Sequence, residues 1–183
     1  MTVRFVTSNE GKVEEARDYL EGIDTVEQVD YDYAELQSDS LEEIVTRGAE
    51  EAYAELGREE PVLVDDTGLF VEALDGFPGP YSAYVEDTLG IERMWRLASD
   101  EESTRARFRT VLAYADGKRT ETFEGSVAGT LVAPRGEDGF GYDPIFEYNG
   151  KTFAEMDTEE KNAISHRGRA LEAFADWLAE REF

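Results

Sequence analysis

The sequence contains no cysteine, only one histidine and no long hydrophobic run. The lack of cysteine excludes disulfide bonds and is consistent with a reducing compartment. No apolar stretch approaches the roughly 20 residues that a membrane-spanning helix requires. The first residues, MTVRFVTSNEGK, also lack the pattern of a signal peptide. We therefore expect a cytoplasmic protein with no membrane partner.

Lysine is scarce as well, and the chain contains only Lys12, Lys118, Lys151 and Lys161. The chain contains 18 Lys and Arg residues and 43 Asp and Glu residues, which gives a formal net charge of −25. The carboxylates are spread through every segment rather than gathered in a tail. At molar salt the Debye length is about 3 Å and self-repulsion is screened. This pattern favours a halophilic cytoplasm over an ordinary acidic protein, and it disfavours nucleic acid as a partner.

The length of 183 residues and the 40% hydrophobic content predict a folded chain, and we expect residues 1–183 to form a single domain. Apolar periodicity and turn residues predict an α/β protein with a mixed sheet. Ser40 and Glu43 form a capping-box pattern before one of the helices. The expected strands are residues 2–7, 26–33, 62–64, 105–115 and 120–134, with 69–74 as a further strand. The expected helices are one ending near residue 20, one at 41–56, one at 90–98 and a last one ending near residue 181.

The first motif with chemical meaning is Ser8-Asn9-Glu10-Gly11-Lys12, which joins a strand to a helix. Such a junction presents backbone N–H groups and the helix dipole to an anion. It is not a Walker A loop, because the first glycine of that motif is missing and Val13 replaces its Ser or Thr. Taken alone, the motif favours a simpler interpretation, in which Ser8 or Asn9 caps the helix and Lys12 is solvated.

The second motif, VLVDDTG, places Asp65 and Asp66 at the end of a buried strand, where open α/β sheets collect ligands. Adjacent side chains on a strand point to opposite faces, so at most one of the two reaches a given site directly. Paired carboxylates suit a general base or a Mg²⁺ ligand. The sequence DDTG is equally typical of an ordinary turn.

The third motif, GFGYDPIF, places Phe140 between two glycines. Glycines on both sides leave the ring open for a flat base, and such stacking is worth about 1–3 kcal/mol. The alternative is a glycine-rich turn with Phe140 in the core, which the motif alone slightly favours.

The fourth motif, KNAISHRGR, contains the only histidine of the chain. Its Ser165 could cap the last helix, its arginine side chains could be solvated, and a lone histidine is more often structural than catalytic. However, Lys12 and Lys161 are two of the four lysines, and both lie near expected loop–helix junctions. This coincidence favours phosphate binding.

In this order, the segments SNEGK, AELQ, VDDTGLFVEALDGFPGPYSA, GFGYDPIF and EEKNAISHRG resemble the inosine triphosphate pyrophosphatase (Ham1-like) family. The resemblance covers nearly the whole chain, and its motifs in series are highly specific. It implies an elongated mixed β-sheet with flanking helices, two lobes around a nucleotide cleft, and a homodimer. It also implies Mg²⁺-dependent hydrolysis, with Mn²⁺ as a possible substitute. The substrates would be ITP, dITP and XTP, and the products a monophosphate and pyrophosphate.

The resemblance implies roles for residues in the first part of the chain. Glu35 and Asp66 would hold Mg²⁺, Asp66 would also accept the proton of the attacking water, and Thr67 would touch the nucleotide. The choice of Asp66 over Asp65 rests on the family pattern. Between Glu35 and Leu41 the chain has one residue more than archaeal members of the family. The residues that would cradle the triphosphate are Thr7, Ser8, Asn9, Glu10, Gly11 and Lys12.

The resemblance also implies a site for the base in the last part of the chain. Phe140 would stack on the purine, and Lys161 would reach the phosphates or the ribose. His166 and Arg167 would read the purine edge. The residues that would complete the wall beside Phe140 are Gly141, Tyr142 and Asp143.

Two other functions stay open at this point. A non-catalytic nucleotide-binding regulator would keep Phe140, Lys161 and His166 but would need neither Asp66 nor a metal, so the VDDTG motif disfavours it. A Maf-type pyrophosphatase acting on modified pyrimidines would share the sheet but would lack the SHRG segment.

Overall fold

The computed structural model describes residues 2–34, 36–137 and 139–181. Its strands are β1 (Thr2–Val6), β2 (Thr25–Val29), β3 (Val62–Val71), β4 (Pro78–Gly79), β5 (Arg105–Ala115), β6 (Thr120–Leu131), β7 (Phe146–Tyr148) and β8 (Lys151–Thr152). Its helices are α1 (Glu10–Tyr19), α2 (Leu41–Glu55), α3 (Ser82–Leu89), α4 (Ile91–Ser99), α5 (Thr158–Ile164) and α6 (His166–Glu180). Three short 3₁₀ turns are η1 (Glu72–Leu74), η2 (Asp143–Ile145) and η3 (Phe153–Glu155).

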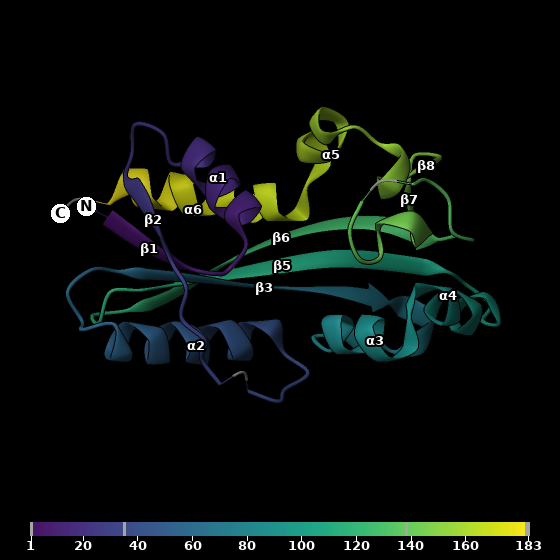
Figure 1. The fold of residues 1–183 in the computed structure, drawn as a ribbon, viewed down its shortest axis with the longest axis horizontal. Coiled ribbons are helices and arrows are strands. Elements are labelled where there is room, and N and C mark those ends of the chain that lie inside the picture. The colour runs from purple at the N-terminus through teal and green to yellow at the C-terminus, as the bar shows by residue number, and fades with distance from the viewer. Residues whose placement is uncertain (1, 35, 138, 182–183) are drawn as a thin grey trace. The chain divides into compact units, whose positions relative to one another are not determined.

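The strands form one eight-stranded sheet in the order β2-β1-β3-β5-β6-β7-β8, with β4 paired to β3 off this path (Figure 1). Strand β1 pairs in parallel with both β2 and β3, whereas β4 pairs antiparallel with β3 and β7 pairs antiparallel with β6 and β8. The prediction of an α/β protein with a mixed sheet and flanking helices is therefore confirmed. Within the described ranges, no helix combines the length and the apolar character that a membrane crossing requires.

Several element boundaries differ from the predictions. Strand β2 is shorter than residues 26–33, β6 ends before residue 134, and helices α3 and α5 were not predicted. Helix α5 ends at Ile164 and α6 begins at His166, so Ser165 alone separates the two helices. The turn of Asp157 and Glu160 starts α5, where each side chain accepts from the other residue's backbone N–H.

Strand β3 corrects the prediction of a short strand that ends in a turn. It runs unbroken for 10 residues, so Asp65 and Asp66 lie within it. Gly68 permits this path, because a Cβ there would lie 2.4 Å from the backbone oxygen of Gly79 on β4. The pairing with β1 involves only Val62 and Leu63, so the two carboxylates lie just beyond the parallel part of the strand.

The chain divides into two compact units. Unit 1 consists of Met1–Asp66, Thr110–Gly125 and Arg167–Phe183, and unit 2 consists of Thr67–Arg109 and Ser126–His166. Strands β3, β5 and β6 contribute residues to both units.

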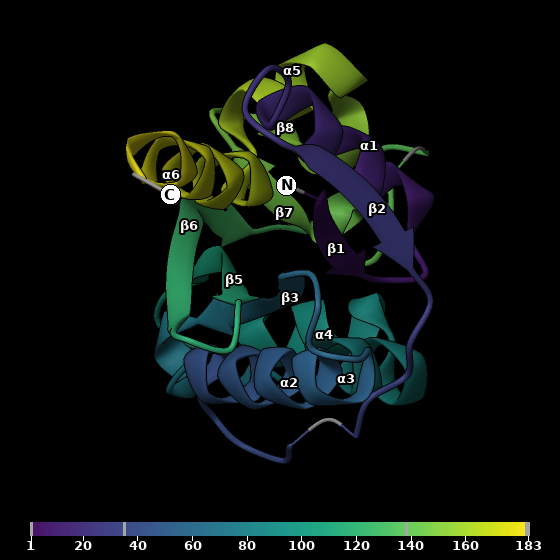
Figure 2. The same cartoon turned by 90° about the vertical axis from the view of Figure 1, so that its left-hand side faces the viewer.

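In unit 1, α1 and α6 lie on one face of the strands and α2 lies on the other (Figure 1, Figure 2). Ser40 caps α2 by accepting the backbone N–H of Glu43 at 3.2 Å, as predicted. The Glu43 carboxylate accepts from Ser38 Oγ instead, so only half of the predicted capping box forms. The core between β1, β3, α1 and α6 includes the apolar residues Val13, Ala16, Leu20, Leu171, Phe174 and Leu178.

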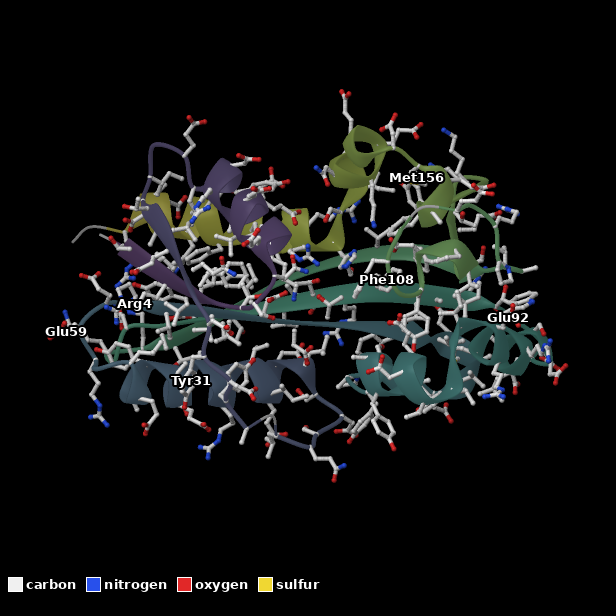
Figure 3. The ribbon with its side chains drawn as sticks, in the orientation of Figure 1. Arg4, Tyr31, Glu59, Glu92, Phe108 and Met156 are labelled. Carbon is white, nitrogen blue, oxygen red and sulfur yellow. The ribbon has the colours of Figure 1, made fainter. Side chains whose placement is uncertain are left out.

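In unit 2, α3 and α4 lie on one face of the strands, while α5 lies on the other (Figure 1). Three phenylalanines fill its core. The ring centroid of Phe108, labelled in Figure 3, lies 4.6 Å from that of Phe146 and 5.8 Å from that of Phe153. This aromatic core supports the segments that carry GFGYDPIF and KNAISHRGR.

Candidate active site

The predicted phosphate loop forms a capped and exposed helix start in unit 1. The Asn9 side chain accepts the backbone N–H of Lys12 at 3.3 Å, which confirms Asn9 as the N-cap of α1. The Asn9 backbone N–H in turn donates to Thr7 Oγ1 at 3.1 Å. Ser8, Glu10 and Gly11 are exposed. The helix start therefore faces solvent, where an anion could reach it.

Lys12 is not a solvated surface lysine. Its ammonium lies 3.0 Å from Asp65 Oδ1 and 2.8 Å from Asp65 Oδ2. The Asp65 side chain is only 2% exposed, and that of Lys12 is 22% exposed. The simpler interpretation of the first motif is therefore correct for the Asn9 cap and wrong for Lys12, which it placed in solvent.

Arg167 joins the same group of charges. Its Nη1 donates to Glu15 Oε2 at 3.0 Å, and its Nε lies 3.8 Å from Asp65 Oδ2. We call Lys12, Glu15, Asp65 and Arg167 the Lys12 cluster. Glu15 was not predicted, although its position three residues after Lys12 places both side chains on one face of α1. That spacing did not indicate that Arg167, 152 residues further along the chain, would be the partner of Glu15.

Asp65 and Asp66 project to opposite faces of β3, as the alternation of a strand requires. Leu63, two residues before Asp65, belongs to the core under α1 and α6, so Asp65 shares that face. Asp66 therefore projects toward the other face and is partly buried. Glu35, the other predicted metal ligand, lies outside the described residues.

The ring of Phe140 in unit 2 is 82% exposed, so the alternative that placed it in the core is wrong. Below it, the buried carboxylate of Asp143 accepts the Phe140 backbone N–H at 2.8 Å and forms an ion pair with Lys161. Gly139 has a φ of 106° and a Cβ there would lie 2.8 Å from the Asp143 Cβ. Asp143 thus fixes both the Phe140 turn and the Lys161 ammonium.

Tyr142 anchors the same turn to α3. Its hydroxyl is buried and donates to the Ser82 backbone oxygen at 2.7 Å. Burial raises the pKa of Tyr142, and the charges of Glu86 and Asp87 raise it further. At Gly141, whose φ is 62°, a Cβ would lie 3.1 Å from Glu86 Oε2. Sequence reasoning did not predict this carboxylate, whose pKa is raised by burial and then by Asp87 and Asp143.

His166 and Lys161 both contact the aromatic core of unit 2. The imidazole stacks on Phe108 with 5.0 Å between ring centroids and 12° between ring planes. The Lys161 ammonium lies 5.9 Å from the Phe153 ring centroid. Thr67 lies within β3 and is partly buried. The predicted base-binding residues of unit 2 are therefore held by packing and ion pairing.

With ITP as the substrate that the family resemblance implies, replacing Asp143 by alanine is expected to lower kcat/KM by roughly tenfold or more. Hydrogen bonds to charged groups contribute about 1.5–3 kcal/mol each, and the variant loses the anchor of both Phe140 and Lys161. Steady-state kinetics measure this effect. Asp87→Ala, an exposed position on the neighbouring helix, is the matched control. Unchanged kcat/KM in Asp143→Ala would mean that the anchored turn does not take part in substrate binding.

The described residues do not by themselves complete a metal centre. Over residues 2–34, 36–137 and 139–181, no group of three or more His, Asp or Glu side chains is arranged to hold a metal ion. The Asp66 carboxylate supplies oxygen atoms of the kind that Mg²⁺ prefers. Two surface hollows, of about 410 Å³ in unit 2 and 580 Å³ in unit 1, are lined by none of the predicted site residues. Neither hollow therefore marks the predicted nucleotide site.

An exposed helix start with a fixed lysine and an exposed ring on a glycine-rich turn are features of α/β proteins that bind phosphorylated ring compounds. The comparison with known proteins gives the particular family. The Ham1 family model matches residues 3–177, and the chain belongs to this family.

Relatives and solved structures agree with this assignment. A dITP/XTP pyrophosphatase of Methanopyrus kandleri is 54% identical over 97% of this chain and 96% of its own length. One from Thermococcus kodakarensis is 51% identical over 98% of each chain. A solved HAM1 protein from Coxiella burnetii is 30% identical with a TM-score of 0.89, covering 99% of this chain and 100% of its own. The solved Ham1 protein of Staphylococcus aureus is 31% identical with a TM-score of 0.87, covering 97% of this chain and 98% of its own.

Proposed function

We propose that this protein is a nucleoside-triphosphate pyrophosphatase that hydrolyses ITP, dITP and XTP to the monophosphate and pyrophosphate. The observation that carries the proposal is the 54% identity, over nearly the whole of both chains, to a relative named dITP/XTP pyrophosphatase. The exposed Phe140 ring and the fixed ammonium of Lys12 support it, because a purine and a triphosphate need such partners.

The triphosphate would bind at the start of α1. The exposed start of α1, at residues Ser8 to Gly11, and the dipole of α1 favour an anion there. The Lys12 ammonium adds a full positive charge in a protein that carries −25. The two cations and two carboxylates of the Lys12 cluster balance, so an anionic substrate would meet less repulsion there than elsewhere on the chain.

In the reaction, the oxygen of a water molecule attacks the α-phosphorus, and the bond from that phosphorus to the bridging oxygen breaks. Pyrophosphate leaves with the bond electrons, and the Asp66 carboxylate takes the proton from the attacking water. Mg²⁺ is proposed as the cofactor, with Asp66 and Glu35 as its protein ligands. When bound, it would supply charge neutralisation on the phosphate oxygens.

The base would bind in unit 2. The 82% exposed ring of Phe140 offers a stacking surface for a purine. Lys161, whose ammonium pairs with Asp143, would reach the ribose or the phosphates, and His166 would offer a ring N–H to a 6-oxo group. Arg167, which belongs to unit 1, would supply the second set of donors for that group.

The decisive experiment measures pyrophosphate release across a nucleotide panel, with Mg²⁺, with Mn²⁺ and with a chelator. We expect rapid release from ITP, dITP and XTP, little from ATP, and loss of activity in the chelator. Nucleotide binding without release would support the regulator instead. Release confined to modified pyrimidine nucleotides would support the Maf-type function. Retained activity in the chelator would contradict the proposed metal dependence.

We also propose a homodimer in a cytoplasm of high salt. Light scattering on the purified protein measures the oligomeric state, and a monomer at all concentrations would contradict the dimer. The interspersed carboxylates are the basis for the salt proposal, because the 43 Asp and Glu repel one another when they are unscreened.

Stability and activity are expected to rise with KCl. Raising KCl from about 0.1 M to about 2 M shortens the Debye length from about 10 Å to less than about 3 Å and relieves this repulsion, so the thermal midpoint should increase by several degrees. Calorimetry measures the midpoint in both salts. A midpoint that stays constant or falls in the higher salt would contradict the halophilic proposal.

A further inference from the structure

We infer that Asp65 is a positioning residue that holds the Lys12 ammonium in place for the triphosphate, an inference that rests on the proposed function. It separates the roles of two adjacent carboxylates that the sequence could not separate. Asp66 is the proposed proton acceptor, and Asp65 acts through Lys12 without touching the substrate.

The geometry of the Lys12 cluster supports this role. Both Asp65 oxygens lie within 3.0 Å of the ammonium, and Arg167 Nε is 3.8 Å from Oδ2. Lysine has a long flexible stem, so an unanchored ammonium would lose much conformational freedom on binding phosphate. The buried carboxylate removes that freedom before the substrate arrives.

The same geometry argues against Asp65 as the proton acceptor or a metal ligand. Its side chain is 2% exposed, so an attacking water has almost no access to its oxygens. Both oxygens face an ammonium, whose positive charge opposes a second cation at the same place. Asp66 projects from the opposite face of β3 and is partly buried there.

A positioning role predicts that substrate affinity and turnover respond differently. The Asp65 charge repels the phosphates, so Asp65→Asn should leave the Kd for ITP unchanged or make it tighter. The ammonium would no longer be fixed, and misplacing a catalytic group by about 1 Å can cost 10²-fold. We therefore expect kcat to fall by roughly 10- to 100-fold. Asp65→Glu keeps the charge and should recover part of this loss.

The environment of the Lys12 ammonium can also be observed by NMR, without measuring catalysis. Reductive methylation with ¹³C-formaldehyde labels Lys12, Lys118, Lys151 and Lys161, and the small number of lysines allows their NMR signals to be resolved. Lys12→Arg assigns the Lys12 signal by its disappearance. In Asp65→Asn this signal should move, whereas the other three should stay. Glu14→Gln, an exposed charge change on the same helix, should move none of them.

Three outcomes would overturn the inference. An unmoved Lys12 signal in Asp65→Asn would show that the ion pair does not hold the ammonium. A weaker Kd that accounts for the whole loss of kcat/KM would show that Asp65 serves binding or folding. A loss of kcat equal to that of Asp66→Asn, with a changed Mg²⁺ requirement, would make Asp65 a metal ligand or the base. If the wild-type protein releases no pyrophosphate, the proposed function fails, while the NMR result still tests the ion pair.

Discussion

Replacing Asp66 by asparagine is expected to lower kcat for ITP by at least about 10²-fold while the protein stays folded. General-base catalysis alone is typically worth 10²–10⁴ in rate, and asparagine cannot accept the proton of the attacking water. The substitution keeps the shape of the side chain, so the partly buried position on β3 should tolerate it. Single-turnover kinetics of pyrophosphate release measure the chemical step directly.

The control for this experiment is Asp18→Asn, which removes one carboxylate from an exposed position on α1. It should leave kcat unchanged, and circular dichroism in high KCl should give the same folded signal for both variants. A folded Asp66→Asn variant with nearly wild-type kcat would show that another group accepts the proton. The inaccessible Asp65 would then be a poor replacement, and a residue outside the Lys12 cluster would have to be sought.

Replacing Arg167 by alanine is expected to lower kcat/KM for ITP by about 10²-fold and for ATP by far less. Inosine presents an acceptor oxygen at position 6, where adenosine presents an amino donor. The guanidinium has only donors, so it would pair with the oxygen and oppose the amino group. Pockets that leave buried polar groups unpaired can reject a substrate by up to roughly 10⁴-fold. The ratio of the two kcat/KM values is the quantity to measure.

The structure makes this test sharper than the sequence did. Arg167 is paired with Glu15 and lies near Asp65, so it belongs to the same cluster as Lys12, the proposed phosphate ligand. Equal losses for ITP and ATP would assign Arg167 to the phosphates or to the fold. Arg169→Ala, two residues along α6 and exposed, is the matched control and should leave the ratio unchanged.

Local patterns were reliable wherever one element determined the outcome. The cap of α2 at Ser40 was correct, because a side-chain oxygen that accepts a backbone N–H three residues later needs no other part of the chain. The two long strands β5 and β6, joined at residues 116–119, followed in the same way from alternation and a turn. The predictions failed where two elements interact. The path of β3 through DDTG depends on the approach of β4 at Gly68, which no local pattern contains.

The exposure of Phe140 shows the same limit in the candidate site. The glycines around it were consistent with an open ring or with a core position, and the motif alone slightly favoured the core. The turn is fixed by Asp143, whose own partner Lys161 lies 18 residues further along the chain, and by Tyr142, whose hydroxyl bonds to Ser82, 60 residues before it. These contacts leave the ring 82% exposed.

By itself, the sequence determined the class of fold, the family and the residue types available for phosphate and purine binding. These follow from periodicity, from composition and from motifs in series, all of which are properties of the chain read in order. Only the tertiary structure decided which charges meet. Lys12 and Asp65 are 53 residues apart, and Glu15 and Arg167 are 152 apart. In a chain with 43 carboxylates, any cation has many potential partners, and packing of β3, α1 and α6 around one core selects among them.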